Sequence, residues 1–163
     1  MTAAGYFVDA SDRDTTPTSW SRAADQAAAA ILRPATIVAG SNGVSVAIRL
    51  AVQHPSLVRK LVLLWPARTG DLRLDQQLPA GAAHLVAGDT IRGVADAELG
   101  ALTLPVAVMA SEPENPIHRR STALRLVTLI PNAVPIEPGF PEPLRPEFRA
   151  QLDAFVDALI PHL

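Results

Sequence analysis

Short apolar runs alternate along the chain with stretches that are amphipathic or rich in alanine. The apolar runs have the length and the β-branched content of buried strands, whereas the stretches between them have helical periodicity. The pattern predicts five strands, at residues 6–10, 35–39, 59–65, 104–110 and 133–137.

Helices are predicted between and after these strands. Thr18 or Ser19 can cap the first of them, and Pro34 limits its far end. Five prolines between Pro135 and Pro146 exclude a helix or a central strand, so we expect residues 138–146 to form a loop. The helices are expected at residues 23–30, 44–54, 80–87, 96–102, 117–130 and 147–159.

Strands that alternate with helices predict an α/β fold with a doubly wound, mostly parallel sheet of about five strands. A length of 163 residues suffices for one sizeable core, and we expect a single domain over residues 1–163. The hydrophobic fraction is 48% and aromatic residues make up only 4%, so the core consists mainly of Ala, Val, Leu and Ile. That composition suits a buried parallel sheet.

Residues 37–43, with the sequence IVAGSNG, carry the clearest chemical signal. An apolar strand stops at Ser41, which has Ala39 two residues before it and Gly43 two residues after it. A serine at a sharp strand-to-helix turn needs small neighbours at these two positions, because larger side chains clash where the chain folds back. We expect Ser41 at the tip of a strained turn, with the amides of Asn42 and Gly43 facing a ligand.

Composition excludes several other kinds of chemistry. The net charge of −2 and the lack of a basic run predict no nucleic-acid partner. The chain has no apolar stretch long enough to cross a membrane and no recognisable leader, so we expect no membrane association and a cytoplasmic protein. The absence of cysteine excludes a disulfide and a thiol nucleophile, and we expect neither a metal nor a cofactor.

The sequence resembles the α/β-hydrolase superfamily over most of its length. The elbow, residues 46–51, the His54-Pro55 pair and residues 58–64 look like the family's nucleophile turn, its helix and the strand after it. Residues 104–109 resemble the strand before the catalytic acid, and residues 130–133 the approach to the last strand. Residues 146–148 and Phe155 resemble the closing helix. The resemblance implies hydrolysis of a small-molecule ester, thioester or lactone at Ser41.

Three departures from the family pattern predict weak activity from a reduced member. Only five residues precede Tyr6, so we expect the strand and the His-Gly loop that donates one oxyanion amide to be missing. Residues 137–142, after the last strand, contain no histidine where the family has its Gly-His pair. In residues 111–116 Glu112 and Glu114 are available as acids, but Asn115 stands where an aspartate would suit the pattern.

A serine hydroxyl is a poor nucleophile without a base. His118 is the best substitute base, because it follows the fourth predicted strand on the same sheet edge as Ser41. A place at a helix start would also disfavour its imidazolium form. His84, in a region that often forms a lid, comes second, whereas His54 is expected to be structural and His162 solvated.

Other residues at this edge have a functional and a purely structural interpretation. Glu114 is a candidate for orienting the base, and Glu112 for binding, yet both also suit exposed loop positions. Arg119 and Arg120 can bind an anion or form a solvated first helical turn. Trp65 and Phe140 are expected either to line an apolar pocket beside Ser41 or to belong to the core.

Fold alone does not decide the activity. One alternative is a catalytically silent relative that binds a small apolar ligand in the same cleft. A second alternative is a cyclase or lyase that uses Glu114 or His118 as a general acid or base without acylating Ser41. Covalent labelling by a fluorophosphonate separates the hydrolase from both alternatives.

The arrangement of helices predicts a homodimer. Right-handed crossovers place the first several helices on one face of the sheet and leave only the last helix for the other face. One such helix is too short to cover five strands. The strand at residues 6–10 is expected to pair directly with that at 35–39, and a second copy of the chain to bury the remaining apolar face. The candidates for that face are Tyr6, Val8, Val38 and Leu63.

Overall fold

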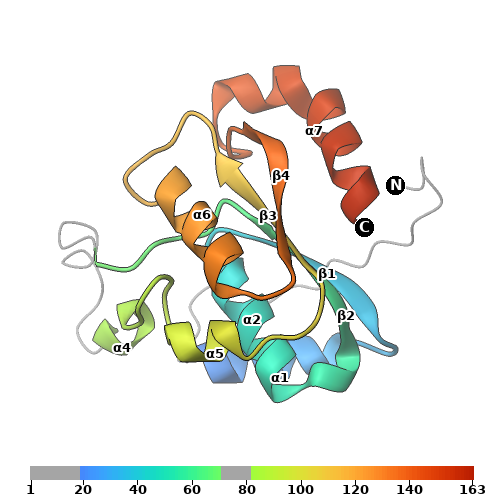
Figure 1. Cartoon of the computed structure of the whole chain (residues 1–163), viewed down its shortest axis with the longest axis vertical. Coiled ribbons are helices and arrows are strands. Elements are labelled where there is room, and N and C mark those ends of the chain that lie inside the picture. Colours follow the sequence, from blue (N-terminus) through green and yellow to red (C-terminus); the bar gives the residue numbers. More distant parts are fainter. Residues whose placement is uncertain (1–18, 71–81) are drawn as a thin grey trace.

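The computed structural model describes residues 19–70 and 82–163. The predicted strand at residues 6–10, with Asp9 and Asp12 and the first part of the helix expected at residues 80–87, lies outside these ranges. Figure 1 shows the described chain as a sheet with helices on both sides.

Within the described residues the sheet has four parallel strands in the order β1-β2-β3-β4, so neighbouring strands in the sheet are also successive along the chain. This confirms the predicted α/β fold and four of the predicted strands. The strands are β1 (Ala35–Gly40), β2 (Val58–Leu64), β3 (Val106–Ser111) and β4 (Ala133–Phe140). The helices are α1 (Trp20–Ala30), α2 (Gly43–Gln53), α4 (Ala83–Val86), α5 (Asp96–Gly100), α6 (Arg120–Leu129) and α7 (Leu152–Leu159), with 3-10 turns η1 (Pro55–Leu57), η2 (Pro146–Gln151) and η3 (Ile160–His162).

Local hydrogen bonds explain where two of the helices begin. The hydroxyl of Ser19 accepts a hydrogen bond from the Arg22 amide and caps α1, as predicted. α6 begins three residues later than predicted, at Arg120. The side-chain carbonyl of Asn115 holds the amides of Ile117 and His118 at 2.8 and 2.9 Å, which keeps this segment in a loop before the helix.

β4 runs further than the sequence pattern predicts. Residues 138–140 were expected to begin a loop, but they continue the strand to Phe140. Pro135 and Pro138 fit in β4 because this strand lies at the edge of the sheet. An edge strand forms backbone hydrogen bonds to a neighbour along one side only, so it tolerates residues without an N–H group. The last predicted helix is divided into the η2 turn and α7.

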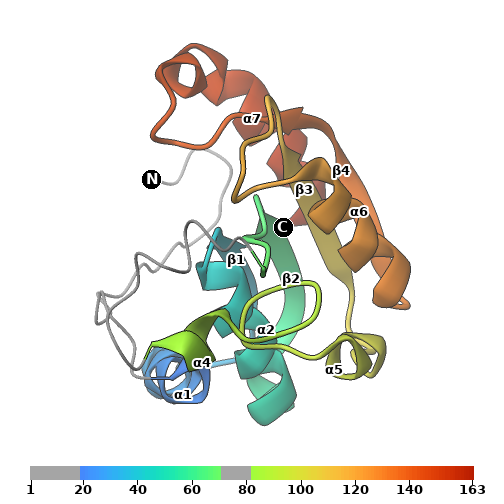
Figure 2. The same cartoon turned by 90° about the vertical axis from the view of Figure 1, so that its left-hand side faces the viewer.

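The two faces of the sheet bury two different cores. Leu61 and Leu63 of β2 belong to the larger core, which also contains side chains from α1, α2, α5 and α6. Val62 and Leu64 point to the opposite face, where α7 contributes Phe155 and Leu159. Figures 1 and 2 show α7 apart from α1, α2 and α5.

The expectation that Leu63 lies on an uncovered face is therefore wrong, because this side chain is completely buried under the helices of the larger core. Val38 of β1 is exposed to 47% of its surface. It is the register partner of Val62, so it lies on the α7 face at the β1 side of the sheet. Of the four residues predicted to lie on the uncovered face, Val38 is thus the only one that is both described and exposed.

Trp65 ties the carboxyl ends of the strands together directly after β2. Its backbone amide donates to the carbonyl of Met109 in β3 at 2.9 Å, and its indole N–H donates to the carbonyl of Phe140 in β4 at 2.7 Å. The ring lies so close to Gly40 of β1 that a Cβ atom there would sit 3.3 Å from it. Trp65 thus holds the strand ends from which the candidate site residues project.

Candidate active site

Ser41 lies in the sharp turn between β1 and α2, as the sequence predicts. Its φ angle of 54° falls in the left-handed region, which is strained for a residue with a Cβ atom. The Ser41 amide donates to the carbonyl of Leu64 at 3.0 Å, which anchors the turn to β2. α2 begins two residues later at Gly43, so the turn leads directly into the first turn of the helix.

A continuous chain of hydrogen bonds joins Ser41, His118 and Glu142. The Oγ atom of Ser41 lies 2.9 Å from Nε2 of His118, and Nδ1 of the same ring lies 2.8 Å from Oε1 of Glu142. The histidine and glutamate side chains are exposed to only 11% and 12% of their surface. A carboxylate at Nδ1 favours the tautomer that carries its proton there, which leaves Nε2 free to accept the serine proton. We call these three residues the triad.

The triad is assembled from the carboxyl ends of three strands. Ser41 follows β1, His118 follows β3, and Glu142 follows β4. Strands of a parallel sheet end at the same edge, and β1 and β3 are separated only by β2. The loop after β3 spans the distance that this intervening strand leaves between Ser41 and His118.

Asn115 shapes the loop that carries His118. Its side-chain carbonyl accepts from the amides of Ile117 and His118, and its side-chain amide donates to Oε1 of Glu142 at 2.6 Å. One side chain therefore fixes the backbone of the histidine and the carboxylate that the histidine contacts.

Glu142 is a buried carboxylate with several donors around it. Ser111 Oγ donates to Oε1 at 2.6 Å, and Arg145 Nε donates to Oε2 at 3.2 Å. Burial by itself raises the pKa of Glu142, but the hydrogen bond from Ser111, the charge of His118 and the hydrogen bond from Arg145 outweigh it. The pKa of Glu142 is therefore lowered, which keeps this group ionised at neutral pH.

The pKa of His118 is also lowered from its ordinary value. Burial is the largest cause, and the positive charges of Arg92 and Arg145 act in the same direction. The carboxylate of Glu142 opposes the shift without cancelling it. The imidazole is consequently neutral at pH 7 and able to accept a proton. His118 directly precedes Arg119, the N-cap residue of α6, so it lies next to a helix start as the sequence predicts.

Glu142 is the site residue that sequence reasoning missed. The family resemblance predicts a histidine in residues 137–142 and an acid in residues 111–116. The structure has the reverse, with the histidine after β3 and the carboxylate after β4. The sequence did contain a usable signal, because one of these two strands is followed by a histidine and the other by a carboxylate.

The two acids that we predicted lie elsewhere. Glu114 accepts hydrogen bonds from Arg119 at 3.1 Å and from the Arg120 amide at 2.9 Å. Glu112 pairs with the Arg120 guanidinium at 3.1 Å. The choice of Glu114 as the acid that contacts His118 is wrong, because the ion pairs hold both carboxylates at the exposed start of α6.

The remaining candidates occupy varied surroundings. Asn42 caps α2 by position and is exposed, and its side-chain oxygen accepts from Arg92 at 3.3 Å. Trp65 and Phe140 are buried in the smaller core, where Phe155 stacks on the indole, so of our two interpretations the core one holds. His54 contacts Asp25 at 2.8 Å away from the triad, and His162 is partly buried instead of fully solvated.

The described residues contain neither a candidate metal site nor a membrane-spanning helix. Within residues 19–70 and 82–163, no group of three or more His, Asp or Glu side chains is arranged to hold a metal ion. Over the same ranges, no helix has the length and apolar character needed to cross a membrane.

Solved structures of α/β-hydrolases have a similar fold, although their sequences are distant. An α/β-hydrolase from Sphaerobacter thermophilus is 19% identical, with a TM-score of 0.61 over 90% of this chain and 76% of that chain. A meta-cleavage product hydrolase from Pseudomonas fluorescens is 14% identical, with a TM-score of 0.69 over 93% of this chain and 74% of that chain. A lipase-esterase related protein from Clostridium acetobutylicum is 12% identical, with a TM-score of 0.66 over 94% and 79%.

No protein-family model matches the sequence, and neither does any curated protein. The similarity to solved structures shows that this chain has the α/β-hydrolase fold. Identities of this size establish the fold alone, so any statement about activity depends on the residues of the candidate site.

Proposed function

We propose that the protein is a serine hydrolase that cleaves small carboxylic esters, thioesters or lactones. In this proposal Ser41 is the nucleophile, His118 the general base and Glu142 the acid that orients it. The observation that carries the proposal is the unbroken contact from Ser41 Oγ through the His118 ring to Glu142, at 2.9 and 2.8 Å. Both distances suit direct proton transfer without movement of the backbone.

In the first half of the reaction, Ser41 Oγ attacks the carbonyl carbon of the ester while its proton passes to Nε2 of His118. The carbonyl oxygen becomes an oxyanion, and the alcohol leaves with the proton that the imidazolium returns to it. Glu142 stabilises the imidazolium, because its negative charge lies 2.8 Å from Nδ1. The acyl group remains on Ser41 as an ester.

In the second half, a water molecule attacks the acyl carbon and His118 takes one of its protons. The acid is then released, and the same proton returns to Ser41 Oγ. Each half therefore needs the imidazole to be neutral at its start, which agrees with the lowered pKa of His118.

The oxyanion needs donors next to Ser41. The amides of Asn42 and Gly43 belong to the first turn of α2, where backbone N–H groups have no acceptor within the helix. The residue after the nucleophile supplies one such donor in an elbow of this type. The partial positive charge at the start of an α-helix adds to the same stabilisation.

The order of the triad along the chain differs from the usual one. In α/β-hydrolases the serine is followed by the acid and then by the histidine. Here we propose the order Ser41, His118, Glu142. Unrelated folds reach the same relative geometry with different chain orders. Exchanging the positions of the histidine and the acid along the chain therefore has no chemical cost, as long as both still form the same hydrogen bonds.

A fluorophosphonate probe tests the proposal directly, because it reacts only with an activated serine. We expect one covalent adduct on the intact protein, located at Ser41 by peptide mass spectrometry, and measurable hydrolysis of p-nitrophenyl butyrate. Ser41→Ala and His118→Ala should remove both. His162→Ala and His54→Ala are matched histidine controls and should keep both, since neither contacts Ser41.

Other outcomes would reject the proposal. A folded protein that neither reacts with the probe nor hydrolyses esters, yet binds a small apolar ligand, would instead be a silent relative. Hydrolysis that persists in Ser41→Ala would point to chemistry that does not acylate the serine.

A further inference from the structure

A buried serine outside the triad contacts its carboxylate. Ser111 is the last residue of β3 and is exposed to only 2% of its surface. Its Oγ atom donates to Oε1 of Glu142 at 2.6 Å, and Oε1 is the same oxygen that Nδ1 of His118 contacts. The carboxylate oxygen beside the base therefore also accepts a hydrogen bond from a residue of the sheet.

Ser111 is a polar residue at the end of an apolar strand. Residues 106–110, which precede it in β3, are all apolar and buried. A hydroxyl buried at such a place costs free energy unless it forms a hydrogen bond. Two acceptors lie in reach of its Oγ atom, Glu142 Oε1 at 2.6 Å and the carbonyl of Pro113 at 3.0 Å. The single hydroxyl proton goes to the carboxylate, because that oxygen is nearer and carries negative charge.

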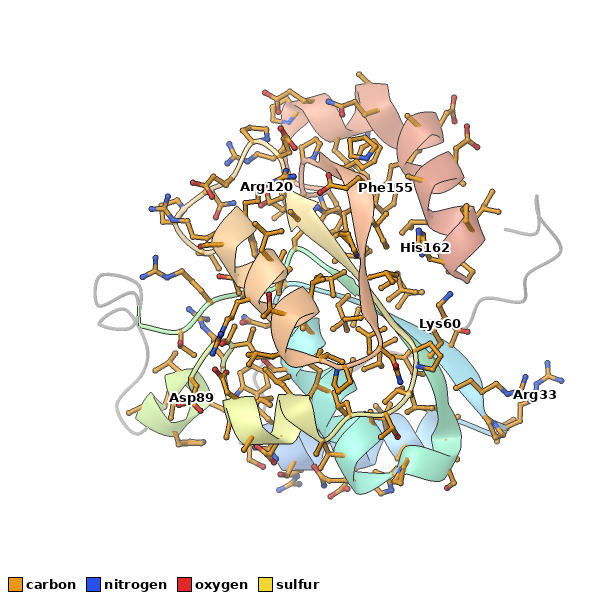
Figure 3. All side chains as sticks on the ribbon, viewed as in Figure 1. Arg33, Lys60, Asp89, Arg120, Phe155 and His162 are labelled. Atoms are coloured by element: carbon orange, nitrogen blue, oxygen red, sulfur yellow. The ribbon has the colours of Figure 1, made fainter. Side chains whose placement is uncertain are left out.

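The backbone of Ser111 is fixed by the packed sheet. Ser111 pairs with Phe140 of β4, after a shift in register that follows Met109. An irregularity of this kind redirects a side chain at the end of a strand. Phe140 in turn packs edge-on against Phe155 of α7, which Figure 3 labels, with 5.7 Å between the ring centroids. The hydroxyl thus projects from a strand that core packing holds in place.

Glu142 depends on its neighbours for the orientation of its carboxylate. It lies after β4 and directly before Pro143, which restricts the backbone of the preceding residue to extended conformations. The proline leaves rotation about the side-chain bonds of Glu142 free. Side-chain donors therefore orient the carboxylate, and these are Ser111 and Asn115 on Oε1 and Arg145 on Oε2.

Ser111 is the most deeply buried of these donors, since Asn115 and Arg145 are only half-buried. Water competes least for a hydrogen bond that is fully buried. Burial has the largest influence on the pKa of Glu142 and raises it, whereas the hydrogen bond from Ser111 is the largest of the influences that lower it. Burial and hydrogen bonding thus both single out Ser111.

Resting on the proposed hydrolase function, we infer that Ser111 is a positioning residue, which holds the ionised carboxylate of Glu142 against Nδ1 of His118. The working form of this pair is a neutral imidazole beside a carboxylate. The two groups titrate as a coupled pair, so a donor to the carboxylate stabilises the working form against a proton added to either group. Ser111 therefore keeps the pair in its working form down to a lower pH.

Ser111→Ala tests this inference through the pH profile of p-nitrophenyl butyrate hydrolysis. We expect kcat to fall about tenfold, because the carboxylate loses a charge-assisted hydrogen bond. The acid limb of kcat/KM should move to higher pH by about one pH unit. Arg92 and Arg145, whose positive charges lower the pKa of His118, remain in this variant, so the shift reports the lost hydrogen bond.

Three further variants complete the comparison. Ser111→Thr keeps the hydroxyl and should keep the native acid limb. Ser111→Cys keeps a group of similar shape but a weaker donor, so its acid limb should also move to higher pH; it takes the place of Ser111→Ala if that variant does not fold. Ser45→Ala removes another buried serine hydroxyl, from α2, and should not move the limb, because Ser45 does not influence the pKa of His118 or Glu142.

An NMR titration of His118 separates this inference from the proposed hydrolysis. The ring C–H signals of His118, assigned by their absence in His118→Gln, report its protonation whether or not esters are cleaved. The midpoint of this titration should rise in Ser111→Ala, as the acid limb does. A raised midpoint in a protein without ester hydrolysis would support the action of Ser111 on the pair and reject the hydrolase.

The opposite results are equally informative. Ester hydrolysis with an unmoved acid limb in Ser111→Ala, whatever its kcat, would show a merely structural hydroxyl and overturn the role of Ser111 while leaving the hydrolase. Absence of hydrolysis together with an unchanged His118 midpoint would overturn both.

Discussion

The side-chain amide of Asn115 donates a 2.6 Å hydrogen bond to Oε1 of Glu142, the same oxygen that His118 contacts. Asn115 occupies the position where an aspartate would suit the family pattern. An amide donor stabilises the neighbouring carboxylate, whereas a second carboxylate would repel it. The asparagine is thus compatible with Glu142, after β4, as the carboxylate that contacts His118.

Asn115→Asp should impair the proposed ester hydrolysis, although it introduces the residue type that the family pattern has. The new carboxylate would lie at hydrogen-bond distance from Glu142, and two carboxylates so close cannot both be ionised easily. We expect kcat/KM on p-nitrophenyl butyrate to fall by about tenfold or more. An Asn115→Asp variant with full activity would mean that Glu142 is not the working acid.

Glu142 and Glu114 make a matched pair for testing which acid serves His118. Glu142→Gln keeps the shape of the side chain but cannot stabilise the imidazolium, so kcat should fall on the order of 10³-fold. Glu114→Gln should change kcat less than about twofold, because Glu114 pairs with Arg119 at an exposed position. Steady-state kinetics on one ester measures both, and the reverse result would restore our original choice of acid.

The dependence of activity on pH follows from the lowered pKa of His118. The base works only when it is neutral, so kcat/KM should rise with pH through an apparent pKa below 6.5 and then reach a plateau. Arg145→Gln removes a positive charge that lowers this pKa, so the acid limb should move to higher pH. Arg33→Gln, with the same loss of charge, should not move it. An acid limb above pH 7 in the native protein would contradict the assignment of His118.

Strain at Ser41 predicts a gain of stability from one substitution. Glycine adopts a φ of 54° freely, whereas alanine retains the Cβ atom that makes this angle unfavourable. Both variants lose the contact with His118, so their comparison isolates the backbone. We expect Ser41→Gly to be more stable than Ser41→Ala by about 1 kcal/mol in urea unfolding. Equal stability would mean that the turn relaxes when the hydroxyl is removed.

The partly exposed α7 face still predicts a homodimer. α7 has eight residues and is about 12 Å long, and Val38 on the β1 side of that face is 47% exposed. Sedimentation at micromolar concentration should give about twice the monomer mass of 17.2 kDa. Val38→Asp should shift the protein to the monomer, because a charge in a dimer interface is costly to bury. A monomer of the native protein at these concentrations would contradict the predicted homodimer.

The sequence alone was sufficient to predict the features that depend on neighbouring residues. The apolar runs that became β1 to β4, the Ser19 cap and the turn at Ser41 are all set by spacing over a few positions. Such patterns can be interpreted without tertiary information, because each element must bury one face and satisfy its own backbone. The proximity of His118 to Ser41 could also be predicted, because the loop after β3 begins at the sheet edge where Ser41 lies.

Only the tertiary structure shows which carboxylate contacts His118. Glu114 is nearer in the chain, but Glu142 is nearer in space, because the pairing of β3 with β4 brings the two loops together. The same holds for Arg92, whose contact with Asn42 joins residues 50 positions apart. Local patterns therefore determined which elements form and where Ser41 lies. Sheet register and side-chain packing decided which side chains lie near Ser41. These contacts join residues that are far apart in the chain, so no short stretch of sequence predicts them.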